Sequence, residues 1–137
     1  MPRIFINIER IRGGKIMDTF GIENVNFTVI NEESKRWDEF KQQRLERGFD
    51  DSELWNLDRT IAKFIYPRLK AFADKTIGTP PSLSKEEWQS ILQKMLDAFD
   101  IIVDDDKYFA YAPSNEEDNI IAIGLDLFAK WFCHLWF

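Results

Sequence analysis

Few residues of this 137-residue chain have the types and spacing that chemistry requires. Its one cysteine and one histidine, Cys133 and His134, are adjacent, so on a helix they point in different directions and make no zinc site unless carboxylates supply the ligands. We expect Cys133 to be a buried, inert thiol, and His134 to act as a base only if a pocket opens beside it. The run Asp104, Asp105 and Asp106 lacks the glycine and glutamate of a calcium loop. The sequence therefore predicts no metal and no cofactor.

Two charged residues, Asp58 and Arg68, fall within or beside the apolar stripe of a predicted helix. The stripe recurs at three- and four-residue spacing and consists of Leu54, Leu57, Ile61, Phe64, Ile65, Leu69 and Phe72. The two charges are roughly 15 Å apart along a straight helix, so each should meet a group on another element. We interpret them as buried polar residues that make structural ion pairs or line an interhelical pocket.

Two acidic segments form a candidate binding surface if the third and the last predicted helices pack as an antiparallel pair. These segments are Asp104, Asp105, Asp106 and Glu116, Glu117, Asp118. Six carboxylates in a small area repel one another, and a purely structural turn has no need of that cost. We therefore expect this end to meet a basic surface on a partner. Trp37 and Trp55 are further candidate binding residues. Trp37 lies on a predicted helix with little other apolar surface, and Trp55 projects away from the apolar stripe of its own helix.

Composition restricts the class of protein. Eighteen basic and 24 acidic residues give a net charge of -6, which disfavours direct binding of nucleic acid, because phosphates need a basic face. The single cysteine excludes an intrachain disulfide and fits a reducing compartment. No signal peptide is expected, and Asp126, Lys130 and His134 interrupt the most apolar segment, so we expect no membrane span. A 45% hydrophobic content predicts one folded domain over residues 1–137.

The predicted fold is α+β and mostly α. Alternating apolar residues on both sides of Gly13 and Gly14 predict a small antiparallel sheet, a hairpin or meander over residues 3–30, packed on a bundle of about four helices. The helices are expected at 32–47, 52–77, 84–103 and 115–137. Pro67 should kink the second helix into two shorter ones.

Start and stop signals refine these ranges. We expect Asp51 or Ser52 to cap the second helix, and capping boxes to begin at Ser84 and Ser114. Gly48 should end the first helix, and Gly124 should contact another backbone closely. Residues 107–111 read as an extended connection or edge strand. The expected aromatic core is Phe64, Phe72, Phe99, Phe128 and Trp131.

Part of the chain resembles a set of small uncharacterised proteins of tailed bacteriophages. The resemblance lies in residues 47–52, 55–58, 61–63 and 67–69, followed by Glu86, Glu87 and Trp88. It covers residues 48–99 and, more loosely, the C-terminal helix. It brings no activity with it, but it implies a phage or prophage origin and hence a target in the host cytoplasm.

These observations lead to three hypotheses. The first is a non-catalytic binding protein that acts on a host protein with a basic surface; an inhibitor of host defence or of a nucleic-acid enzyme is one form of it. The second is a small hydrolase or nucleotide-handling enzyme with a pocket at Asp58 and Arg68. The third is a virion or scaffold component. The sequence does not indicate an oligomeric state.

Overall fold

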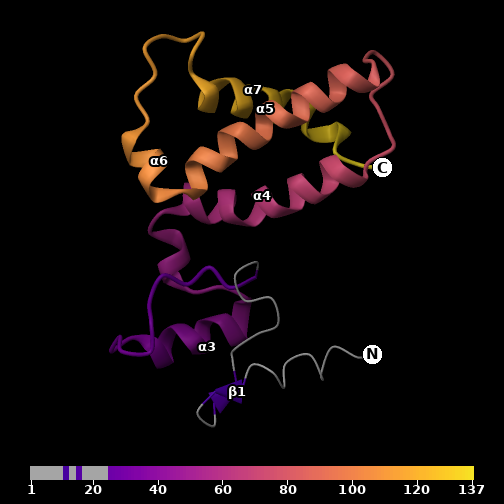
Figure 1. The fold of residues 1–137 in the computed structure, drawn as a ribbon. Helices are drawn as coiled ribbons and strands as arrows, with labels where there is room; N and C mark the ends of the chain where they lie inside the picture. The colour runs from indigo at the N-terminus through magenta and orange to yellow at the C-terminus, as the bar shows by residue number, and fades with distance from the viewer. Residues whose placement is uncertain (1–10, 13–14, 17–24) are drawn as a thin grey trace. The chain divides into compact units, whose positions relative to one another are not determined.

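The computed structural model describes residues 11–12, 15–16 and 25–137 (Figure 1). The chain divides into two compact units, Met1–Thr60 and Ile61–Phe137, and each is described by itself. The prediction of a single domain over residues 1–137 stays a prediction.

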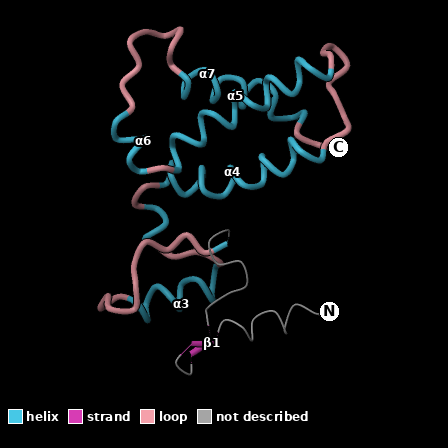
Figure 2. Tube along the Cα trace, in the orientation of Figure 1, coloured by secondary structure: helices cyan, strands magenta, loops and turns pink. Residues whose placement is uncertain are grey.

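The predicted N-terminal sheet is wrong. In the described part of the chain the only strand pairing is between β1, Ile11–Arg12, and β2, Lys15–Ile16, and the rest is helices joined by loops (Figure 2). Residues 25–29, the expected third strand, do not form a strand in the described part of the chain, and the Val29 N–H donates to the Ser52 hydroxyl at 3.1 Å. The alternation at residues 4–8 lies outside the described residues. The described part of the chain is therefore mostly α rather than α+β.

The first described helix of the N-terminal unit is α3, Trp37–Arg47. It begins later than residue 32 because residues 32–36 form turns, the first closed by the Asn31 side chain, which accepts from the Glu33 N–H at 3.0 Å. Gly48 ends the helix as predicted. Its φ of 86° lies in the left-handed region, and its N–H donates to the Arg44 carbonyl at 2.8 Å.

The predicted second helix consists of two elements. The first is a short 3-10 helix, η2, Asp51–Leu54, and its cap is Asp50 rather than Asp51 or Ser52. The second is α4, Leu57–Lys75, which continues through Pro67 as one helix, so the prediction of two shorter helices is wrong. Pro67 has no N–H for the Lys63 carbonyl four residues earlier, and in the same turn Arg68 Nη1 donates to the neighbouring Phe64 carbonyl at 2.8 Å.

The C-terminal unit is built around α5, Lys85–Val103, which carries most of the buried apolar side chains. Its predicted capping box is confirmed: the Glu87 N–H donates to Ser84 Oγ at 3.1 Å, and the Ser84 N–H donates to Glu87 Oε2 at 2.7 Å. The later elements are α6, Asp105–Ala110, α7, Ile120–Trp131, and η3, Phe132–His134. The core cluster consists of Ala62, Leu69, Trp88, Leu92, Met95, Leu96, Phe99 and Ile102.

The helices α5 and α7 pack side by side as an antiparallel pair (Figure 1). The direction follows from two edge-to-face ring pairs, because Trp88 near the start of α5 meets Trp131, whereas Phe99 near its end meets Phe128. The predicted close contact of Gly124 with another backbone is confirmed: an added Cβ would lie 2.5 Å from the Lys94 carbonyl oxygen and would also overlap the Ala98 side chain.

Four further predictions for this unit are wrong. Residues 105–110 form a helix, because the Asp104 carboxylate accepts from the Lys107 N–H at 3.0 Å and caps a new turn. The last helix starts at Ile120 instead of residue 115, capped by Asn119 rather than Ser114. Cys133 is exposed rather than buried. In α4, Phe64 was expected in the core but is 48% exposed.

Candidate functional site

A polar groove lies between α4 and α5 in the C-terminal unit. It has a volume of about 340 Å³ and is called here the acidic groove. Its lining residues are Tyr66, Lys70, Ala73 and Asp74 from α4, and Gln89, Gln93, Leu96, Asp97 and Asp100 from α5. Three carboxylates and one lysine line it, so the groove has an excess of negative charge.

Asp100 is the most constrained carboxylate of the groove. Its Oδ1 accepts from the Tyr66 hydroxyl at 3.1 Å, and its Oδ2 accepts from Lys107 Nζ at 2.7 Å. The hydrogen bond from Lys107 is the main cause that holds the pKa of Asp100 below its ordinary value, against the opposing effect of burial. Burial and the bond to this carboxylate raise the pKa of Tyr66, while Asp100 raises the pKa of Lys107. At neutral pH Asp100 is therefore an anion with two charge-stabilising donors.

Two glutamines and one further carboxylate extend the polar lining along α5. Gln89 Nε2 donates to the Ala73 carbonyl at 3.3 Å and so ties α5 to α4. Gln93 Nε2 donates to Asp97 Oδ1 at 2.8 Å. Both amides use a donor in these bonds, and each keeps a carbonyl oxygen that is suited to accept from a ligand. The groove thus presents mostly hydrogen-bond acceptors.

The two acidic segments predicted as a binding surface lie at the same end of the α5–α7 pair. Asp104, Asp105 and Asp106 follow the end of α5, and Glu116, Glu117 and Asp118 precede the start of α7. Figure 1 shows α6 and the following loop at this end. We call these six residues the acidic end. Asp104 caps α6, and Asp118 Oδ2 accepts from Asn115 Nδ2 at 3.0 Å. All of the six except Asp104 are exposed.

The acidic end and the acidic groove are continuous along the chain. Asp97, Asp100 and Asp104 recur at spacings of three and four residues, so they share one face of α5 and its C-terminal cap. Lys107 Nζ, from the first turn of α6, donates to Asp100 Oδ2. A ligand in the groove would therefore meet further carboxylates beyond the end of α5.

Asp58 and Arg68 do not form the predicted buried polar site. Both are exposed, and Arg68 lies on Phe64, with its guanidinium carbon 4.0 Å from the ring centroid. Asp58 belongs to the N-terminal unit and Arg68 to the C-terminal one. The prediction that they are buried is wrong, and Arg68 has a structural explanation in its contacts with Phe64.

Trp37 and Trp55 both lie in the N-terminal unit, around α3. The Trp55 ring is 54% exposed and meets the buried Phe40 edge-on at 5.9 Å. Trp37 is partly buried, with the Arg44 guanidinium 5.7 Å from its ring centroid. Their role as binding residues stays a prediction.

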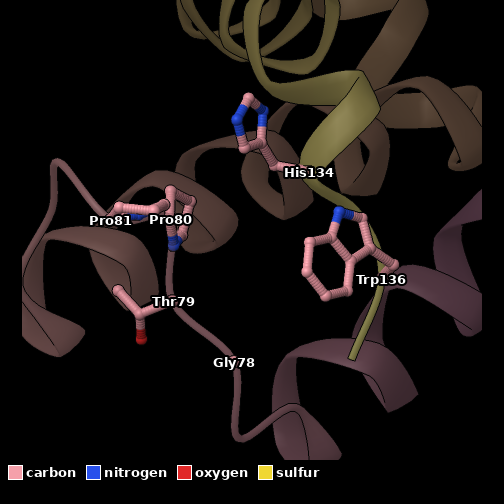
Figure 3. A pocket seen from close by; sticks show the side chains of 6 residues that line it. All are labelled: Gly78, Thr79, Pro80, Pro81, His134 and Trp136. Atoms are coloured by element: carbon pink, nitrogen blue, oxygen red, sulfur yellow. The ribbon is translucent and has the colours of Figure 1, made fainter.

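A second, smaller pocket lies between the loop that follows α4 and the C-terminal segment (Figure 3). It has a volume of about 150 Å³, and we call it the histidine pocket. Gly78, Thr79, Pro80 and Pro81 line one side, and His134 and Trp136 line the other. We expected His134 to act as a base only if a pocket opened beside it, and His134 lines this pocket.

No group of three or more metal-binding side chains occurs within residues 11–12, 15–16 and 25–137. None of the helices that the structure describes has the length and apolar character to cross a bilayer. Comparisons with protein-family models, with curated proteins and with solved structures find no match to the chain. The resemblance to phage proteins stays a prediction.

The acidic groove was not predicted from the sequence, although the sequence of α5 contains a pattern that belongs to it. Gln89, Gln93, Asp97 and Asp100 form a polar row at four- and three-residue spacing along a helix whose other face is apolar. Such a row is ordinarily a solvated face. What distinguishes this one is its packing against Tyr66 and Lys70, and the sequence alone does not show which helices are neighbours.

Proposed function

We propose that this chain is a non-catalytic binding protein whose C-terminal unit receives a basic segment of a partner protein. The observation that carries the proposal is the acidic groove, a cavity of about 340 Å³ lined by Asp74, Asp97 and Asp100. A cavity of this size falls within the range of ligand pockets, and it admits one or two long side chains.

The lining favours an arginine or lysine side chain. Carboxylates accept the parallel N–H donors of a guanidinium, and the Gln89 and Gln93 carbonyls add neutral acceptors. A phosphate or carboxylate ligand would meet three like charges against Lys70. Asp100 is already bonded to Lys107, so Asp97 and Asp74 are the carboxylates that we expect to bind the partner's charge directly.

The acidic end extends the same charge beyond the groove. A partner segment with several basic residues would place one in the groove and others near Asp105 and Asp106. Long-range attraction of this kind raises association rates and is screened by salt, with a Debye length of roughly 8 Å at physiological ionic strength. We therefore expect affinity to fall as salt rises.

The test uses fluorescence anisotropy with a labelled arginine- and lysine-containing peptide and a peptide of the same length with glutamines in their place. The protein should bind the basic peptide and not the glutamine peptide. Asp97→Asn combined with Asp74→Asn should weaken binding at least ~10-fold, the loss of about 1.4 kcal/mol. Asp105→Asn with Asp106→Asn should weaken it less and reduce its salt dependence.

Glu86→Gln with Asp126→Asn is the matched control, since it removes the same charge from exposed positions outside the groove and the acidic end. If the control variant weakened peptide binding as much as the groove variant does, net charge alone would explain the loss of affinity. That result would contradict binding in a defined groove. Absence of binding to the basic peptide in low salt would contradict the proposal as a whole.

The partner that we propose to seek is a host protein with a basic surface, in the host cytoplasm. The choice follows from the predicted resemblance of residues 48–99 to phage proteins, and an inhibitor of a nucleic-acid enzyme is the form that best suits an acidic ligand. Capture from a bacterial lysate with the wild-type protein and with the Asp74 and Asp97 double variant would identify candidates. A specific partner should be lost with the variant.

A further inference from the structure

The histidine pocket has no role in the binding function proposed above. Its six lining residues differ from those of the acidic groove, and none of them is Asp, Glu, Lys or Arg. A charged ligand would therefore lose its hydration in the pocket without meeting a counter-charge. This favours a neutral ligand.

The size of the pocket selects a single ring. An apolar cavity of roughly 150 Å³ holds a benzene molecule, and this pocket has a volume of about 150 Å³. Pro80 and Pro81 present flat, apolar surfaces on one side, and the Trp136 indole lies opposite them (Figure 3). Flat apolar walls of this kind suit an aromatic ring, because stacking on an indole adds to the area that is buried.

The imidazole of His134 supplies the polar function. Its Nδ1 is buried and has no hydrogen-bond partner among the residues that the structure describes, and a buried unpaired nitrogen is costly. The ring packs edge-on to Trp131, with centroids 5.1 Å apart, which fixes where it lies but leaves a two-fold choice of ring orientation. In either orientation the His134 ring remains part of the pocket wall. The Thr79 hydroxyl oxygen, by contrast, points away from it in Figure 3.

We propose that the histidine pocket binds a neutral phenol ring, with the phenol hydroxyl donating to the His134 imidazole and the ring lying between Trp136 and the two prolines. A neutral phenol combines the required features: one flat ring, no charge at neutral pH, and one strong hydrogen-bond donor. The same group is carried by small phenolic compounds and by tyrosine side chains of peptides.

The test follows the backbone amide of Gly78 and the indole N–H of Trp136 by two-dimensional NMR during titration of the full chain. Para-cresol and toluene form the first pair, because they share a shape and differ by the hydroxyl. N-acetyl-tyrosinamide and N-acetyl-phenylalaninamide form the second pair and separate the two sources of the ring. We expect para-cresol to bind roughly 3- to 10-fold more tightly than toluene, the gain of one net hydrogen bond.

Variants test which side chains cause the tighter binding of para-cresol. His134→Phe keeps an aromatic ring but has no nitrogen, so para-cresol should bind it no more tightly than toluene does. Trp136→Ala should weaken both ligands, and Phe109→Ala, an exposed aromatic of α6, should change neither. A proton spectrum of each variant with wild-type dispersion shows that it is folded.

Each outcome decides the proposal. Equal affinities of para-cresol and toluene for the wild type, or an unchanged preference in His134→Phe, would overturn the role of the imidazole. Shifts that leave Gly78 and Trp136 unaffected would overturn the site itself. Binding of para-cresol but not of the tyrosine amide would assign the pocket to free phenols, and binding of both would assign it to tyrosine-bearing peptides as well. The binding of basic peptides has no part in these results.

Discussion

Gly124 of α7 lies so close to Ala98 of α5 that no methyl group fits between the two helices. A Cβ built at Gly124 would overlap the Ala98 side chain and would lie 2.5 Å from the Lys94 carbonyl oxygen. Gly124 therefore determines how closely α5 and α7 approach each other. Both acidic segments lie at one end of this helix pair.

Gly124→Ala should destabilise the protein, although the same change in an exposed helix stabilises it by about 1 kcal/mol. We expect a loss of about 1 to 3 kcal/mol, because the methyl group forces the helices apart. Chemical denaturation followed by tryptophan fluorescence measures the loss. Gly78→Ala is the control, since its nearest neighbour, the Phe137 carbonyl carbon, is 3.4 Å away. A gain of stability in Gly124→Ala would contradict the close contact.

Asp50→Ala should be among the most damaging changes in the N-terminal unit. The carboxylate is fully buried, accepts from Arg44 Nη1 at 2.6 Å and from the Ser52 N–H at 2.8 Å, and caps η2. Removing one partner of a buried ion pair costs about 3 to 5 kcal/mol. The control is Asp51→Ala, which breaks an ion pair with Arg47 that is open to solvent and should cost much less. Similar losses in the two variants would mean that the Asp50 network contributes little.

The same carboxylate predicts a dependence of stability on pH. Burial raises the pKa of Asp50, but hydrogen bonds from Ser52, Thr28 and Arg44 outweigh it and leave the pKa below its ordinary value of 3.8. The unfolded chain therefore binds this proton more readily than the folded one, so the stability is complete above the ordinary pKa and is lost as pH falls through the folded one. Unfolding free energies measured from neutral pH down to acid should fall less steeply in Asp50→Asn than in the wild type. Parallel curves would show that Asp50 does not carry this effect.

Tyr66 should report on the acidic groove through its own titration. Burial and the hydrogen bond to Asp100 raise its pKa above 10.0. Asp100→Asn removes the negative charge beside the phenol, so the pKa of Tyr66 should move down toward its ordinary value. NMR titration of labelled tyrosine rings follows this change. An unchanged Tyr66 pKa would show that the two groups are not coupled.

The predictable parts of this fold were those set by local sequence. The Ser84 capping box, the Gly48 stop and the close contact at Gly124 all follow from the chemistry of one residue and its immediate surroundings. Pairing between distant segments was not predictable in this way. Alternation at residues 25–29 looks like a strand, yet the Val29 N–H is taken by the Ser52 side chain, 23 residues away.

The acidic groove was harder to predict because its lining residues come from two helices, α4 and α5, and only the packing of these helices brings them together. Asp100 and Tyr66 are 34 positions apart and share no motif. Asp58 and Arg68 were predicted to be buried because they interrupt an apolar stripe. That stripe is itself partly exposed, so the two charges need no buried partner. Burial of a charge cannot be inferred from periodicity alone when the helix face it occupies is not covered.

Tyr111 closes the connection between α6 and α7. Its hydroxyl donates to Asn119 Oδ1 at 2.7 Å and accepts from the Ile121 N–H at 3.0 Å, so the exposed residues 112–118 form a loop with fixed ends. The entropy of such a loop grows only with the logarithm of its length, and doubling it costs about 0.6 kcal/mol. Extra residues inserted after Pro113 should therefore be tolerated, and they would allow the spacing between Asp105 and Glu116 to be lengthened without altering either charge.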